Sequence, residues 1–407
     1  MHLDLHSISE NKPGKKWQKC FQQHWPSYKA WYLSKERIKS PSLRTCRARL
    51  KKHMPEFYPT YLQLCDLAGK DPVAHRFLTG FQPPPYMSGC AQVVNEREAQ
   101  LIRNYDFDPN LSEGTLLHSA WNEKKVIAMG DSLIGVVDGM NDSGLVVSLT
   151  FGGRRVIGEG FGIPFILRYV LEFCTTLNQA VDALKRIPSH MSYNIMLMNQ
   201  FGEHSLVQIA PDRAPKVTDL SASTNHQEEV DWPEHALFTK TIERELYLQE
   251  MLVKSEFSSE QIADAFLKAP LFNRKYKQGF GTIYTAVYQP KFGAMELRWP
   301  GVSLRQTFTG FQEGVTTIRY SEKLDVSTTV EIPASQLQAD YNHAVESYWT
   351  EYGKTWATNE HEASKSVHAI SNRIQELLAQ MDRVAKAQSS YPLLSESKIK
   401  SRVRMKK

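Results

Sequence analysis

A glycine followed by a cysteine, after a run of prolines, is the feature of this sequence with the clearest chemical potential. In the stretch PPPYMSGCAQ, prolines at 83–85 end a helix-like region, and Gly89 and Cys90 follow. A cysteine thiol has a pKa of about 8.5, so it needs a nearby base to act as a nucleophile near neutral pH. If the chain were cut before Cys90, the new α-amine, with a pKa of about 8, would lie within a few bonds of that thiol. The alternative is that Cys90 is one more small buried residue, the usual fate of a free cysteine.

Two charged residues that follow Cys90 could tune such a thiol. Arg103 and Asp106 stand three positions apart at the end of the strand-like run AQLIRNYDF. A guanidinium beside a thiol lowers the thiol pKa, and a carboxylate can hold and orient an ammonium group. An ordinary surface ion pair is the competing explanation for these two charges.

The remaining cysteines and the charge pattern exclude several classes of protein. The 407 residues include five cysteines and no C-x-x-C pair, which argues against a disulfide framework and a cysteine-rich zinc site. No cluster of His, Cys and acidic residues has metal-ligand spacing, so we expect neither a metal nor another cofactor. The net charge of +5 comes from the tail SKIKSRVRMKK, whose six basic residues leave −1 for the rest. No nucleic-acid partner is therefore expected.

The sequence also offers no segment for secretion or membrane insertion. The opening MHLDLHSISENKPGKKW lacks the apolar stretch of a signal peptide. No run approaches the roughly 18 to 20 apolar residues that span a bilayer. Together with the odd number of cysteines, this favours a soluble protein in the cytoplasm without a membrane partner.

Three regions of the chain differ in composition and in the pattern of their apolar residues. We expect a helical N-terminal segment at 1–89, a core of strands and helices at 90–333 and a charged helical tail at 334–407. In the core, short apolar runs alternate with turn residues, and turns at 141–144 and 199–202 are typical of hairpins. Helices are predicted at IPFILRYVLEF, TLNQAVDALKRI, EHALFTKTIERELYLQEMLV and SSEQIADAFLKA. Antiparallel strands with grouped helices indicate an α+β domain.

The tail carries an apolar seam of its own. Its apolar residues recur at steps of three and four, as in a short coiled coil. They are Val367, Ile370, Ile374, Leu377, Met381 and Val384. This helix could pack onto the body of the protein, or it could join two copies into a homo-oligomer, and the pattern does not choose between the two.

Five motifs, taken in order, give the sequence a family resemblance. They are GC at 89–90, RNYDFDP at 103–109, DGMNDSGL at 138–145, STNHQ at 223–227 and TIYTAVYQPKFGAMELRWPG at 282–301. In this order they resemble the acyl-coenzyme A:6-aminopenicillanic acid acyltransferase-like proteins. That family belongs with the choloylglycine hydrolases and penicillin V acylases among the N-terminal-nucleophile (Ntn) hydrolases. The resemblance runs from about residue 17 to residue 320.

The resemblance implies a fold and a set of site residues. The fold is an αββα sandwich, two antiparallel sheets between layers of helices, matured by self-cleavage between Gly89 and Cys90. After the cut, the segment at 1–89 could leave as a propeptide or stay bound as a separate chain. The site residues that it implies, motif by motif, are Cys90, Arg103, Asp106, Asn141, Asn225 and Arg244.

Each of these residues has an implied role. Cys90 is the nucleophile and, through its α-amine, the base, with the Arg-x-x-Asp pair beside it. Asn141 and Asn225 help to build the oxyanion hole, and Arg244 matches a later arginine of the family. For Asn141 the ordinary alternative is strong, because NDSG is what any hairpin turn would use.

We therefore expect a self-cleaving cysteine amidase or acyltransferase. It would act on linear amide or acyl thioester bonds through an acyl-enzyme on Cys90, and its partner would be a small acylated amine or an acyl-coenzyme A-like substrate. Two alternatives stay open. One is a catalytically silent binding or assembly protein of the same fold, and the other is an uncleaved cysteine hydrolase with His226 or His118 as its base.

Overall fold

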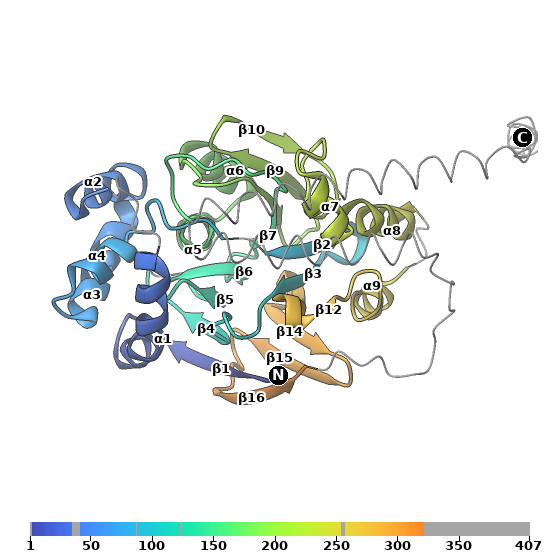
Figure 1. Ribbon diagram of the computed structural model, residues 1–407. Helices are drawn as coiled ribbons and strands as arrows, with labels where there is room; N and C mark the ends of the chain where they lie inside the picture. The colour runs from blue at the N-terminus through green and yellow to red at the C-terminus, as the bar shows by residue number, and fades with distance from the viewer. Residues whose placement is uncertain (1, 35–40, 87, 123, 254–256, 321–407) are drawn as a thin grey trace, which may run out of the picture. The chain divides into compact units, whose positions relative to one another are not determined.

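Two β-sheets and the helices packed against them make up the described part of the chain (Figure 1). The computed structural model describes residues 2–34, 41–86, 88–122, 124–253 and 257–320, all within the unit Met1–Asp325. The predicted tail at 334–407, with its seam, lies outside the described residues. Within the described ranges, no helix combines the length and the apolar character needed to cross a membrane.

The larger sheet has nine strands in the order β10-β9-β8-β7-β6-β5-β4-β1-β16. Neighbouring strands are antiparallel except β1 and β4, which are parallel. The strands are β1 (His2–Glu10), β4 (Thr115–Ser119), β5 (Val126–Asp131), β6 (Gly135–Asn141), β7 (Val146–Phe151), β8 (Tyr193–Met198), β9 (His204–Ala210), β10 (Arg213–Thr218) and β16 (Gly314–Arg319).

The smaller sheet has seven strands, six of them in the order β11-β2-β3-β13-β14-β15, with β12 paired to β13. All of its pairs are antiparallel. The strands are β2 (Gly89–Asn95), β3 (Gln100–Phe107), β11 (Ala222–Ser223), β12 (Arg274–Lys275), β13 (Phe280–Gln289), β14 (Ala294–Trp299) and β15 (Val302–Thr307).

Helices cover a face of each sheet. On the larger sheet, α5 (Ile163–Phe173) lies against β6 and β7, and α6 (Leu177–Arg186) lies against β8 and β9. On the smaller sheet, α8 (Thr241–Val253) lies against β2, and α9 (Ser259–Phe266) lies against β3; α7 (Pro233–Thr239) precedes α8. Strand β2 of the smaller sheet also contacts β7 of the larger one. The prediction of a mixed α and β domain with two sheets is thus confirmed.

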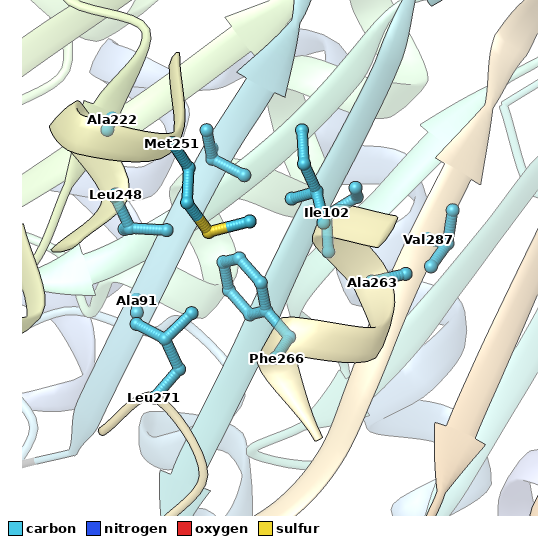
Figure 2. Packing of buried hydrophobic residues seen from close by; sticks show 11 residues of the cluster. Ala91, Ile102, Ala222, Leu248, Met251, Ala263, Phe266, Leu271 and Val287 are labelled. Atoms are coloured by element: carbon cyan, nitrogen blue, oxygen red, sulfur yellow. The ribbon is translucent and has the colours of Figure 1, made fainter. Parts of the chain in front are cut away.

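An apolar cluster joins the smaller sheet to its two helices (Figure 2). Successive side chains of a strand point to opposite faces, so alternate residues of β2 and β3 face the helices. The cluster consists of Ala91, Val93, Ile102, Ala222, Leu248, Met251, Ile262, Ala263, Phe266, Leu271 and Val287. This packing fixes which face of β2 is left for Cys90.

Local signals in the sequence set the helix starts and the hairpins. Thr176 and Gln179 form a capping box at the start of α6, and Pro164 lies in the first turn of α5. The predicted turns at 141–144 and 199–202 join β6 to β7 and β8 to β9. Short 3-10 helices are η1 (Pro55–Phe57), η2 (Glu96–Glu98), η3 (Tyr276–Gln278) and η4 (Pro290–Phe292).

The N-terminal segment differs from the prediction at its start. Four helices are grouped together in it: α1 (Lys15–Ser34), α2 (Leu43–His53), α3 (Tyr58–Ala68) and α4 (Pro72–Phe77) (Figure 1). Before them, however, β1 is a strand, because HLDLHSIS has the two-residue alternation of a strand, with Leu3 and Leu5 buried. Strand β1 lies between β4 and β16, so both of its edges are paired.

Candidate active site

Cys90 is the second residue of β2 and is fully buried. It pairs with Tyr105 of β3, and its side chain shares a face with that of Gln92, whose amide donates to the Asn194 carbonyl on β8. The face of Ala91 is the one that packs on the helices. The thiol of Cys90 therefore points between the two sheets.

The residue before the cysteine has a steric reason to be glycine. A Cβ atom on Gly89 would come within 1.8 Å of the Phe280 ring, so no larger residue fits without moving that ring. The close packing brings β13 against the bond that precedes Cys90. The glycine in this motif is therefore explained by the lack of space for a side chain.

The guanidinium of Arg103 reaches the thiol. Its Nη2 lies 2.9 Å from Cys90 Sγ, and its Nη1 donates to Asp138 Oδ2 at 2.6 Å and to the Val137 carbonyl at 2.9 Å. Burial raises the pKa of Cys90 above its ordinary value, the positive charge of Arg103 opposes that rise, and Asp106 adds to it. In the uncut chain the thiol is thus a protonated group beside a cation.

The backbone atoms of Cys90 are held by two further side chains. Its N–H donates to Asn225 Oδ1 at 3.0 Å. Arg244 donates from Nη1 to the Cys90 carbonyl at 3.1 Å and from Nη2 to Asn225 Oδ1 at 2.6 Å. Nitrogen, carbonyl and sulfur of one residue thus each have a polar side-chain partner, and these partners are buried.

Asp106 completes this group from β3. Its Oδ2 lies 3.2 Å from Arg244 Nη1, and its Oδ1 accepts from Thr282 Oγ1 at 2.7 Å. Burial raises the pKa of Asp106, and the charge of Arg244 opposes the rise. The carboxylate is thereby placed to hold the arginine that contacts both Cys90 and Asn225.

Asn225 has a hydrogen to spare. Its amide donates to the Phe151 carbonyl at 3.3 Å, while its backbone N–H donates to Thr241 Oγ1 at 2.6 Å. A side-chain amide carries two N–H donors, and among the described residues only the Phe151 carbonyl accepts from this one, so one hydrogen remains for another acceptor. Since Asn225 Oδ1 already touches the nitrogen of Cys90, such an acceptor would be close to the thiol.

Comparison with known proteins identifies the family of the chain. The family described as acyl-coenzyme A:6-aminopenicillanic acid acyl-transferase matches residues 93–303, more than half of the chain. The chain belongs to this family. The matched segment begins just after Cys90 and includes the implied positions 103, 106, 141, 225 and 244.

Solved structures similar to this member of the family are distant. A mutant of the conjugated bile acid hydrolase from Clostridium perfringens is 13% identical, with a TM-score of 0.34, over 60% of this chain and 99% of that one. Penicillin V acylase from Agrobacterium tumefaciens is 14% identical, with a TM-score of 0.34, over 58% of this chain and 88% of that one. No curated protein sequence matches. Similarity at this level does not define an activity.

One residue implied by the family motifs has a different place. Asn141, at the end of β6, donates from its amide to the carbonyls of Leu171 and Cys174 at 2.9 and 2.8 Å. Its Oδ1 accepts from the backbone N–H groups of Ser143 and Leu145. Both amide hydrogens are therefore used at the end of α5, and the amide oxygen is used in the turn. We correct the prediction: Asn141 is a turn residue and not an oxyanion donor.

The two histidines weighed as bases are engaged elsewhere. His226 contacts Thr241 through Nδ1 at 2.9 Å and Glu245 through Nε2 at 3.1 Å. His118 Nδ1 lies 3.0 Å from Ser9 Oγ, where β4 meets β1. Neither arrangement aims a ring nitrogen at the thiol, which weakens the histidine alternative.

Several polar residues of the site were missed from the sequence. Asp138 accepts from Arg103, Tyr284 and Tyr288 both donate to Asp138, and Thr282 donates to Asp106. An acidic residue inside the apolar run SLIGVVDGM, and tyrosines four apart on a strand, were signals that could have pointed to them. Among the described residues, no group of three or more His, Cys, Asp or Glu side chains could hold a metal ion.

Proposed function

We propose that this family member is an Ntn-type cysteine amidohydrolase or acyltransferase whose nucleophile is Cys90, freed by cleavage of the bond after Gly89. The observation that carries the proposal is the arrangement around one residue. Arg103 contacts the sulfur, and Asn225 accepts from the nitrogen that cleavage would turn into an α-amine. Helices on one face of each sheet, with β2 against β7, support an αββα sandwich for the core at 90–333.

The cleavage step is an acyl shift within the chain. The Cys90 thiol adds to the Gly89 carbonyl carbon, the C–N bond breaks, and a thioester and a free α-amine form. Water then hydrolyses the thioester, which releases the Gly89 carboxylate and restores the thiol. The product holds the nucleophile and its base in a single residue.

Turnover uses the same atoms. The α-amine, oriented by Asn225 Oδ1, takes the proton of the thiol, and the thiolate beside Arg103 attacks the carbonyl of the substrate. The spare amide hydrogen of Asn225 donates to the oxyanion, a contact worth about 3 to 4 kcal/mol of barrier. The ammonium of Cys90 then gives its proton to the leaving amine. Water or a second amine resolves the acyl-enzyme.

The N-terminal segment at 1–89 should stay bound after the cut. Strand β1 is paired on both edges, and the Trp17 indole donates to the Leu133 carbonyl at 2.9 Å in the core. Tyr28 of α1 donates to Glu113 at 2.6 Å. Removing the segment would expose β4 and β16, so we expect a complex of two chains rather than a released propeptide.

Trapping of the acyl-enzyme tests the proposal. The purified protein would be mixed with N-acyl amino acids, penicillins, N-acyl amines and acyl-coenzyme A thioesters, quenched in acid and digested. We expect the acyl mass on a peptide that begins at Cys90, and its transfer to an added amine would separate acyl transfer from hydrolysis. Cys90→Ser should lose most turnover, because a hydroxyl ionises far less readily than a thiol. Full turnover by Cys90→Ala would refute the assignment.

A further inference from the structure

A buried carboxylate on the larger sheet is bound to the guanidinium that reaches the thiol. Asp138 of β6 is fully buried, and three donors converge on it. Arg103 Nη1 and the Tyr284 hydroxyl each donate to Oδ2 at 2.6 Å, and the Tyr288 hydroxyl donates to Oδ1. The three donors come from β3 and β13, so the contacts cross from one sheet to the other.

This arrangement decides which nitrogen of Arg103 is left for Cys90. Nη1 donates to the Asp138 carboxylate and the Val137 carbonyl, both on β6. Of the two terminal nitrogens, only Nη2 contacts Cys90 Sγ. The Tyr105 ring lies 5.0 Å from the guanidinium carbon and restrains its plane from one side. A planar guanidinium fixed at one end has little freedom at the other.

We infer that Asp138, held by Tyr284 and Tyr288, is a positioning residue that fixes the Arg103 guanidinium against the Cys90 thiol. The inference rests on the proposed role of Cys90. Both tyrosines remain protonated donors, because burial and then the Asp138 charge raise their pKa well above 10. Asp138 thus has two neutral donors and one cation as partners.

If Asp138 and Arg103 formed a purely structural ion pair, Asp138→Asn would not raise the pKa of Cys90. The sign of the change in that pKa therefore distinguishes a structural role of Asp138 from a positioning role. The charged or titratable groups that face the thiol are Arg103, Tyr105, Asp106 and Arg244, with Asp138 behind Arg103 and with Tyr284 and Tyr288 behind Asp138. In Asp138→Asn a negative charge disappears, which by itself would lower the pKa of Cys90. If Arg103 also loses its fixed position, the loss of its contact raises that pKa instead.

The test compares the pH dependence of kcat/KM, and of Cys90 alkylation by iodoacetamide, in four proteins. These are the wild type, Asp138→Asn, Tyr284→Phe/Tyr288→Phe, and the control Tyr61→Phe. The control removes another buried tyrosine hydroxyl, which donates to the His75 carbonyl in the N-terminal segment. We expect the acid limb of both profiles to move up by about one pH unit in Asp138→Asn, and in the same direction in the double tyrosine variant. The control should match the wild type.

Each outcome decides the matter. An unchanged or downward-shifted limb in a folded Asp138→Asn protein would overturn the inference. If that variant fails to fold, the double tyrosine variant, which changes no charge, decides by the same criterion. Failure of the proposed function is recognised separately, since turnover would then survive in Cys90→Ala and iodoacetamide would leave wild-type activity intact.

Discussion

Arg244 offers a prediction in which stability and activity separate. This buried guanidinium contacts the Asp106 carboxylate, the Cys90 carbonyl and Asn225 Oδ1. In Arg244→Met the Asp106 carboxylate stays buried, loses its cation and keeps the hydrogen bond from Thr282. Breaking one side of a buried ion pair costs about 3 to 5 kcal/mol, and Asp106→Asn should cost a similar amount.

The double variant, Asp106→Asn with Arg244→Met, should cost far less than the sum of the two. We expect a coupling of about 2 kcal/mol or more, because neither charge is then left alone. Turnover should not return, because Asn225 has lost the arginine that holds its Oδ1, and a misplaced oxyanion donor costs roughly 100- to 1000-fold in kcat.

The free energies of unfolding of the single and double variants are measured by urea unfolding in a Cys90→Ala background, where the chain stays intact. Turnover is measured with Cys90 present. Arg49→Met is the control: Arg49 pairs with Glu159, and the two side chains are 37% and 55% exposed, so its loss should cost about 1 kcal/mol or less. Additive losses in the double variant, or turnover restored by it, would refute the reasoning.

Three further predictions concern other parts of the structure. Gly89→Ala should slow the appearance of cut chain on denaturing gels, since its Cβ would lie 1.8 Å from the Phe280 ring, and it should cost about 1 to 3 kcal/mol. Asn141→Ala should lower the free energy of unfolding by about 1 to 3 kcal/mol with kcat/KM unchanged, whereas Asn225→Ala should lower kcat about 100-fold or more. Burial, followed by a neighbouring carboxyl group, raises the pKa of Glu113 from 4.5 to about 7, so the folded protein retains a proton that the unfolded chain releases. Its contribution to stability is thus present below pH 4.5 and lost as the pH rises to about 7. Glu113→Gln should reduce that slope in thermal unfolding measured against pH, while the neighbouring Asp131, whose pKa burial also raises, keeps the rest.

Short-range signals in the sequence predicted much of the fold. The capping box at Thr176, the proline in α5 and the hairpin turns act over a few residues, so they can be identified without the rest of the chain. Strand β1 shows the limit. Its alternation was present in the sequence, but its partner β16 lies more than 300 residues away, as in the pair His2 and Arg319.

Some residues of the site could likewise be predicted from their spacing in the sequence, and others could not. Cys90, Arg103 and Asp106 lie on two adjacent strands, so their spacing in the sequence was informative. The contact of Arg103 with Asp138 joins two sheets, and only their packing reveals it. Asn141 shows the opposite error, because a motif match was given more weight than the turn that the same letters favour.

The chain ends of the active enzyme test the central claim most directly. N-terminal sequencing and denaturing mass measurement of a preparation that is turning over substrate should give a chain that begins with Cys90 and a second chain that ends at Gly89. Native mass should show the two together. A fully active preparation that contains only the intact 46.5 kDa chain would contradict the account.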